Sequence, residues 1–296
     1  MKFSECEVKW LKSLPNPDGI LKNIQTRSRN CLLNNQNLNN NNEEWKLTDI
    51  KRLENFIRLP LSASDENGYE EKYPVLKQKQ NNVLQLVINP INNQINESSL
   101  PEGIRKLTDE QLKLHLGKTI NNFKFKDQWP ILINESSTKQ VIGLELKGEE
   151  LPILEIIFPA SPNFLNSTRL ILIVEENTNF ELIQVMIGKN NSAQSNLIEI
   201  IAGEKSNIKH GLIALGGGEG NLLTHLAIEQ EISSEYSLTS LQEGWNFSRL
   251  EPNVLQKNGC AKTTLKGLQI TTDKQQISTH SFVQFNGPNG RLEQIN

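Results

Sequence analysis

The spacing of the apolar residues changes near Trp129, and this change divides the chain into two predicted regions. Before it, apolar side chains recur at three- and four-residue intervals, as in Trp10 and Leu14, which is typical of amphipathic helices. After it, strand-length runs rich in β-branched residues follow one another at intervals of roughly eight to twelve residues. The pattern predicts a helical or mixed region over residues 1–125 and a β-rich region over residues 126–296.

The start of the chain carries capping and termination signals for three helices. The first helix is expected to end at Pro15, and a second is expected over residues 18–33, before an asparagine-rich loop near residues 34–42. Thr48 is the expected N-cap of a third helix, whose apolar face is formed by residues 50–57.

Two shorter elements are expected before the β-rich region, beyond a polar, loop-like stretch at residues 62–74. Residues 83–88 have the apolar composition of a buried strand, and an Asn-Pro dipeptide closes it. Thr108 and Gln111 form the capping-box pattern Thr-x-x-Gln, which predicts a short helix that ends at Gly117.

The apolar runs of the β-rich region favour a parallel β-helix, with a sandwich or barrel as the alternative. No helical crossover interrupts them, and tight hairpin signals are nearly absent, the late Asn286-Gly287 being an exception. Apolar residues alternate with small or polar ones, as a single inward face on each rung requires. The expected strands cover residues 131–133, 142–146, 153–157, 170–174, 182–187, 197–201 and 207–215.

Composition narrows the function classes. The net charge of −3 argues against a nucleic-acid-binding protein, which usually has a basic face. No run approaches the roughly eighteen apolar residues of a membrane span, and the first residues are charged where a signal peptide needs an apolar core. A cytoplasmic protein with no membrane or nucleic-acid partner is therefore expected. Its three dispersed cysteines are expected to be ordinary reduced thiols.

The glycine-rich segment Gly216–Gly220 does not match a nucleotide-binding loop. A phosphate-binding loop would continue with Gly-Lys-Ser/Thr, and a dinucleotide fingerprint would need a third glycine at Asn221. A flexible turn is the expected structure. Paired glutamates at residues 43–44, 149–150 and 175–176 would point to opposite faces of a strand, so solvated side chains are expected.

The histidines His115, His210, His225 and His280 lack the spacing of a metal motif. His210 and His225 could lie on successive rungs as a ligand pair, but packed or surface histidines are expected. No ordered Ser, His and Asp signature is present. The residues therefore assign no catalytic, cofactor-binding or metal-binding position, and the chain is not expected to be an enzyme.

Four sequence pieces together carry a family resemblance. In their order and spacing, they resemble the SufD branch of the SufB/SufD family, whose members act in iron–sulfur cluster assembly within a SufBCD complex. The pieces are Trp10-Leu11-x-x-Leu14-Pro15; Glu44-Trp45-Lys46-Leu47-Thr48-Asp49-Ile50; His210 with Gln230 and Tyr236; and Arg249, Gly259-x-Ala261, Leu265-x-Gly267-Leu268, Gln276 and His280-Ser281-x-Val283.

The resemblance implies a right-handed parallel β-helix after an N-terminal helical region, and a non-catalytic scaffold that pairs with SufB and the SufC ATPase. ATP would be bound by SufC, and the iron–sulfur cluster would be assembled on the complex. Ser278 and Phe285 stand where many family members have an acid and a histidine, so no cluster ligand is transferred to this chain. The family continues beyond the position of Asn296, and the β-helix is expected to be incomplete there. A polysaccharide-active β-helix enzyme and a structural β-solenoid are the alternatives.

Overall fold

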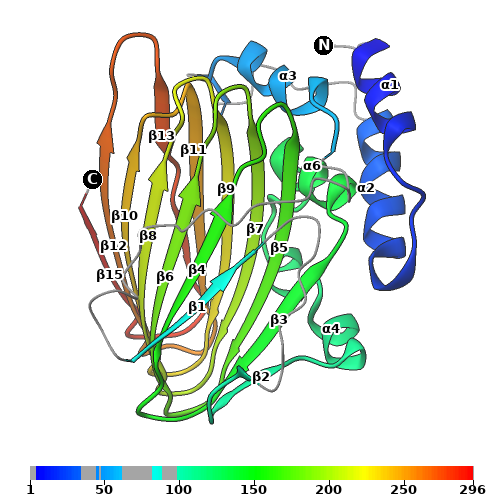
Figure 1. Ribbon diagram of the computed structural model, residues 1–296. Coiled ribbons are helices and arrows are strands. Elements are labelled where there is room, and N and C mark those ends of the chain that lie inside the picture. Colours follow the sequence, from blue (N-terminus) through cyan, green and yellow to red (C-terminus); the bar gives the residue numbers. More distant parts are fainter. Residues whose placement is uncertain (1–4, 35–44, 47, 62–81, 89–98, 296) are drawn as a thin grey trace.

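A computed structural model describes residues 5–34, 45–46, 48–61, 82–88 and 99–295. The chain forms a right-handed parallel β-solenoid, and helices from the N-terminal region lie against one side of it (Figure 1). The predicted fold class is confirmed. No helix within these ranges is both long and apolar enough to cross a membrane.

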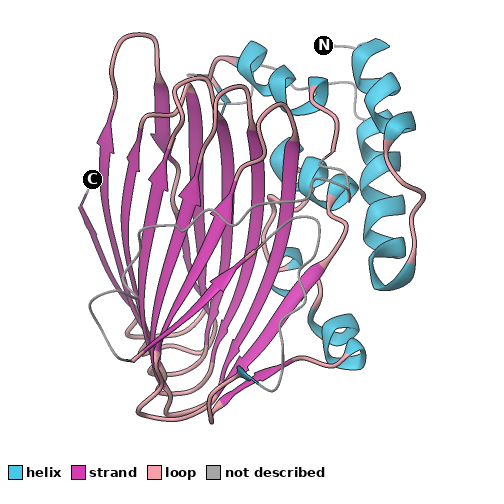
Figure 2. Ribbon diagram, viewed as in Figure 1, coloured by secondary structure: helices cyan, strands magenta, loops and turns pink. Residues whose placement is uncertain are grey.

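The solenoid consists of two sheets that face each other, and consecutive strands from β3 to β13 alternate between them (Figure 2). All strand pairs are parallel except β2 and β3. The helix-facing sheet contains β2 (Ile104–Lys106), β3 (Val141–Leu146), β5 (Leu165–Val174), β7 (Ala193–Ala202), β9 (Asn221–Gln230), β11 (Phe247–Gln256), β13 (Gln276–Thr279) and β14 (Phe282–Phe285). The opposite sheet contains β1 (Val83–Val87), β4 (Ile153–Pro159), β6 (Asn179–Ile187), β8 (Asn207–Leu215), β10 (Glu235–Glu243), β12 (Lys262–Ile270) and β15 (Arg291–Ile295).

Alternate residues of each strand fill the interior between the sheets, because successive side chains point to opposite faces. In the helix-facing sheet, Leu172, Ile200, Ile228 and Val254 lie side by side on four neighbouring strands and are fully buried. Aligned apolar positions of this kind build one continuous core along the solenoid. The predicted alternation therefore sets which side chains enter the core.

The helices cover the outer face of the helix-facing sheet. Their apolar residues form a second core with outward-facing strand residues, in which Phe56 contacts the rings of Trp129 and Phe247 edge-on. The elements are α1 (Glu5–Ser13), η1 (Gly19–Leu21), α2 (Lys22–Asn34), α3 (Ile50–Arg58), α4 (Asp109–His115), α5 (Lys118–Asn121) and α6 (Trp129–Ser137). Both faces of this sheet are consequently buried along most of β5, β7, β9 and β11.

The predicted helix ends are mostly confirmed, with one correction. The capping box of Thr108 and Gln111 is present, with both reciprocal hydrogen bonds. The expected cap at Thr48 is wrong, because Asp49 occupies the N-cap of α3 and accepts a hydrogen bond from the backbone N–H of Lys51. The Thr48 hydroxyl instead accepts a hydrogen bond from Arg249.

Two predicted strands are wrong in type or burial. Residues 131–133 belong to α6, in which all nine residues are buried and Pro130 occupies the first turn. A helix that is buried on all sides has no solvent-exposed face to give it an amphipathic period, and the short apolar run of α6 therefore resembles a buried strand. β1 was expected to be buried, but it lies at a sheet edge and is only partly buried.

Four earlier expectations fall outside the described residues. They are most of the asparagine-rich loop, at residues 35–42; the loop at residues 62–74; the Asn-Pro dipeptide at residues 89–90; and the glutamate pair at residues 43–44.

A fully buried ion cluster holds α5 and α6 on the helix-facing sheet. The Arg169 guanidinium on β5 contacts the carboxylates of Glu199 on β7, at 2.7 Å, and of Glu135 on α6, at 3.2 Å. Glu199 also accepts hydrogen bonds from the backbone N–H groups of Gly117, Thr119 and Ile120 at the start of α5. Arg169 is thus the cation that pairs with Glu199, and it shares Glu135 with Arg27 of α2, whose Nη2 lies 2.6 Å from the other Glu135 oxygen.

Replacing Arg169 with methionine should lower the free energy of unfolding by about 3–5 kcal/mol, because Glu199 would remain buried without a cation and Glu135 would keep only Arg27. The measurement is urea-induced unfolding followed by circular dichroism. Arg58→Met is the matched control, since Arg58 pairs with Glu54 on the exposed face of α3 and should cost under about 1 kcal/mol. Equal losses in the two variants would contradict the assigned role of Arg169.

Candidate functional site

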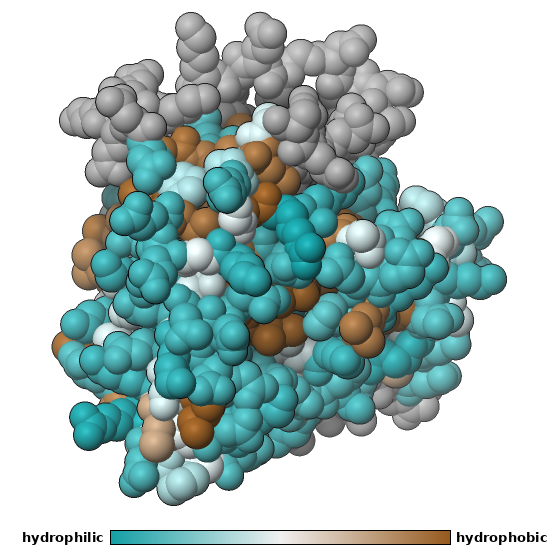
Figure 3. All heavy atoms as spheres, turned by 90° about the horizontal axis from the view of Figure 1, so that it is seen from below, coloured by the Kyte–Doolittle hydropathy of each residue, from teal (hydrophilic) through white to brown (hydrophobic). Residues whose placement is uncertain are grey.

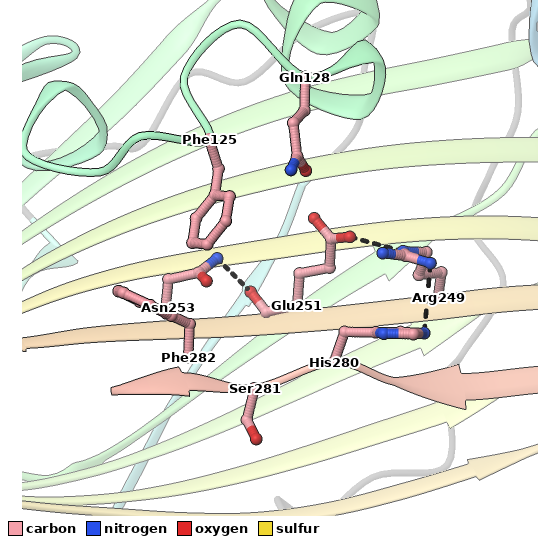
Figure 4. A pocket seen from close by; sticks show the side chains of 8 residues that line it. All are labelled: Phe125, Gln128, Arg249, Glu251, Asn253, His280, Ser281 and Phe282. Carbon is pink, nitrogen blue, oxygen red and sulfur yellow. Dashed lines mark hydrogen bonds and ion pairs between the residues drawn. The ribbon is translucent and has the colours of Figure 1, made fainter. Parts of the chain in front are cut away.

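A small pocket lies on the outer face of the helix-facing sheet, beside the loop that precedes α6 (Figure 4). Its volume is about 180 Å³. It is lined by Phe125, Gln128, Arg249, Glu251, Asn253, His280, Ser281 and Phe282. The strand β11 provides the polar floor, and the two phenylalanine rings contact each other edge-on at 4.9 Å between centroids.

The period of two along β11 places three polar side chains in this pocket. Arg249, Glu251 and Asn253 point outward, whereas Leu250 between them and Val254 after them belong to the solenoid core. Each of the three polar residues is at least 95% buried beneath the helical layer. Buried charges and amides at these positions need partners, and the surrounding elements provide them.

Proline at position 252 explains why the neighbouring edge strand is divided into β13 and β14. The backbone N–H of His280 donates to the carbonyl of Leu250 at 2.9 Å. In a regular parallel ladder the N–H of residue 252 would donate back to His280, but proline has no N–H. The ladder therefore stops at His280 and resumes at Phe282. This interruption places His280 and Ser281 at the rim of the pocket.

Arg249 joins four parts of the molecule. Its Nε donates to Glu251 at 2.5 Å, its Nη1 donates to the Thr48 hydroxyl at 3.0 Å, and its guanidinium carbon lies 3.9 Å from the ring centroid of Trp45. Its Nη1 also lies 3.2 Å from Nε2 of His280. Because a guanidinium only donates, Nε2 of His280 must be the acceptor, and its proton is therefore on Nδ1.

A second series of side-chain hydrogen bonds fixes the position of the Glu251 carboxylate. Nδ1 of His225, on the neighbouring strand β9, donates to Glu251 at 2.8 Å, and the Asn253 amide donates to Nε2 of His225 at 2.8 Å. Burial would raise the pKa of Glu251, but the hydrogen bond from His225 and the charge of Arg249 outweigh it and lower the pKa to about 2. Glu251 is therefore ionised over the whole physiological range.

His280 is neutral at neutral pH. Burial lowers its pKa first, and the adjacent Arg249 charge lowers it further, with Glu251 acting weakly in the opposite direction. The charges of Arg249 and Glu251 cancel within the site, and both oxygens of Glu251 are already hydrogen-bonded. This arrangement binds the segment around residues 45–48 to β9, β11 and the edge strand, and it presents no activated nucleophile.

The histidines considered in the sequence lie in separate environments. His210 is inside the solenoid, between the side chains of Gln184 and Tyr236 at 2.8 Å each, and burial lowers its pKa to about 3. His225 faces outward on the other sheet, so the two histidines do not form a ligand pair. His115 ends α4. Within the described ranges, no group of three His, Cys, Asp or Glu side chains is placed to hold a metal ion.

The glycine-rich segment Gly216–Gly220 is a turn, as expected, and tight packing explains its composition. A Cβ atom on Gly216 would collide with the backbone carbonyl of Gly244, and one on Gly217 would lie 2.7 Å from the Cα of Lys189. The ring of Trp245 covers Gly188 and Gly220. Glycine is therefore needed here for the close approach of successive turns.

Most remaining candidates are solvent-exposed. Three of the four glutamates at residues 149–150 and 175–176 are exposed and the fourth is partly exposed, which confirms solvation of the described pairs. Cys6 and Cys260 are exposed and Cys31 is partly buried, all as free thiols.

The sequence analysis did not single out two residues of the pocket, Glu251 and Asn253. The alternation of polar and core residues in Arg249-Leu250-Glu251 was the available signal.

Part of the solenoid is similar to a known protein family. Residues 158–296 match the sequence profile of the family described as "SUF system FeS cluster assembly, SufBD core domain". The match includes every strand from β5 to β15 and the pocket residues of β11 and the edge strand. It supports the SufB/SufD family and a role in iron–sulfur cluster assembly. A search of curated proteins finds no match to this chain.

Gly216→Ala should lower the free energy of unfolding by about 1–3 kcal/mol, because the new methyl group would meet backbone atoms that cannot rotate away. Thermal unfolding measures the effect. Gly211→Ala is the control, since its Cβ would meet mainly the movable end of the Ile183 side chain. The loss of unfolding free energy should therefore be smaller in this variant. If Gly211→Ala were the more damaging change, close turn packing would not be the reason for the glycine.

The stability of the protein should depend on pH through His280. The pKa of His280 is lower in the folded chain than in the unfolded chain, so its contribution is complete above about pH 6.5 and is lost as the pH falls towards the folded value. His280→Gln can still accept from Arg249 but cannot be protonated. Between about pH 8 and pH 5, thermal unfolding temperatures should fall more steeply for the wild type than for the variant. Parallel curves would rule out this titration.

Proposed function

We propose that this chain is a SufD-like scaffold subunit that pairs with SufB and with the SufC ATPase during iron–sulfur cluster assembly. The observation that carries the proposal is the SufBD core match over residues 158–296, which coincides with the regular rungs of the solenoid. The SufD assignment within the family rests on the sequence likeness, chiefly the segment from Arg249 to Val283.

The structure supports a positioning role for this chain. Rungs that share one core behave as a stiff body, and the pocket on β11 uses its charged groups to join elements. The sequence contains no Walker motif, so ATP hydrolysis would belong to SufC. The cluster being assembled would be the substrate of the whole complex, and we propose that the complex acts in the cytoplasm.

Co-expression with the partners from the same organism tests this proposal. The chain should co-elute with SufB and tagged SufC in a single species on size-exclusion chromatography with light scattering. Tagged SufC with SufB alone gives the background of the assay. Partner choice separates the two branches of the family, because a SufD-like chain should assemble with SufB and fail to assemble with a second SufD.

Two results would count against the proposal. Assembly with a SufD and not with SufB would identify a SufB-like chain. A folded, monodisperse chain that joins neither partner, while SufB and SufC still bind each other, would remove the scaffold role.

A further inference from the structure

A second and larger pocket has no role in the proposed scaffold function. It lies between α4, α5 and the ends of β9 and β11, and its volume is about 530 Å³. It opens where the turns after β9 and β11 leave the solenoid. Figure 3 views the molecule from that end, where the surface is largely hydrophilic and apolar areas are small.

Each oxygen of the two carboxylates in this pocket already accepts a hydrogen bond. Glu229 accepts from the amide of Asn122 at 2.5 Å and from the ammonium group of Lys257 at 2.9 Å, each with a different oxygen. Glu231 accepts from Lys257 at 2.8 Å and from the amide of Asn258. Lys257 thus neutralises part of the acidic charge, and the four carboxylate oxygens are occupied.

Three hydrogen-bonding groups of the pocket remain available to a ligand: the Lys118 ammonium group can only donate, whereas the Thr119 hydroxyl and the His115 ring nitrogen can donate or accept. The Thr119 side chain is 1% exposed, lines the pocket, and its hydroxyl has no partner among the described residues. Lys118 also lines the pocket, and the described part of the chain offers its ammonium group neither an ion pair nor a hydrogen bond. Nδ1 of His115 is buried and likewise unpartnered within the described ranges. A buried polar group without a hydrogen bond lowers stability. A ligand with several acceptor atoms would provide the missing hydrogen bonds on this side of the pocket.

The other wall is apolar. The side chains of Ile201 and Leu255 line the pocket. This combination selects against a free amine, because Lys118 would repel it and the carboxylates are already occupied. It also disfavours inorganic phosphate, which has no apolar part to cover Ile201 and Leu255.

We propose that this pocket binds a small organic carboxylate, with its oxygens against Lys118 and Thr119 and its short apolar stem against Ile201 and Leu255. The inference is independent of the family assignment, since it rests only on the groups that line the pocket.

Butyrate is the probe, titrated into the purified 296-residue chain at constant ionic strength and followed by saturation-transfer difference NMR. Saturable binding is expected, with acetate weaker because its stem is shorter, and butylamine without saturable binding. Failure of butyrate to saturate, or equal binding of butylamine, would overturn the proposal. Phosphate binding as tightly as butyrate would also overturn it, because the apolar wall would then have no role.

Two variants locate the site. Lys118→Met should weaken butyrate binding about fivefold, the scale of a partly exposed ion pair, while Lys118→Arg should preserve it. Thr119→Val removes an unpartnered hydroxyl at constant shape, so it should weaken binding while leaving the unfolding temperature unchanged or higher. Lys113→Met is the matched control, because Lys113 is exposed on α4 and does not line the pocket. Equal losses at Lys113 and Lys118 would show only a general charge effect and would overturn the assignment.

Discussion

Alignment of each strand with its equivalent in the next rung is the constraint on which the rest of this structure depends. Because the register is kept from β5 to β11, inward positions form one continuous core and outward positions form parallel rows beneath the helices. From β5 to β11 the helix-facing sheet is almost entirely buried on both faces, so a charged residue there needs a partner within the protein. Arg169 and Arg249 each meet this requirement by pairing with carboxylates in the same buried layer.

The two buried arginines find their partners on different elements. Arg169 neutralises one glutamate from a helix and one from the neighbouring strand, and the strand glutamate in turn caps the start of α5. Arg249 pairs with Glu251 on its own strand and uses its remaining donors on Thr48 and His280. A charged group buried in such a layer lowers stability unless its ion pairs and hydrogen bonds have good geometry. This requirement favours one defined docking position for the helical region.

The sequence predicts the solenoid well because the alternation of inward and outward side chains can be read within each strand, without knowledge of distant contacts. The strands expected between residues 142 and 215 were located correctly, although β5 begins at Leu165, earlier than its apolar run suggests. The N-terminal half of β5 contains Asn166 and Thr168, whose buried hydrogen bonds hide them from a hydrophobicity pattern. The errors at α6 and Asp49 have a similar origin, since burial on all sides and the choice between adjacent capping residues depend on packing.

The candidate site was only partly accessible to sequence reasoning. Polar residues at alternate positions of β11 could be read directly, but their partners come from distant segments. Thr48 and Arg249 are 201 positions apart, and this separation suggests an order of events during folding. Contacts so remote carry a high loop-closure entropy until the intervening rungs exist. Loop-closure entropy therefore favours docking of the segment around Trp45 and Thr48 after the rungs have formed, although this segment precedes them in synthesis.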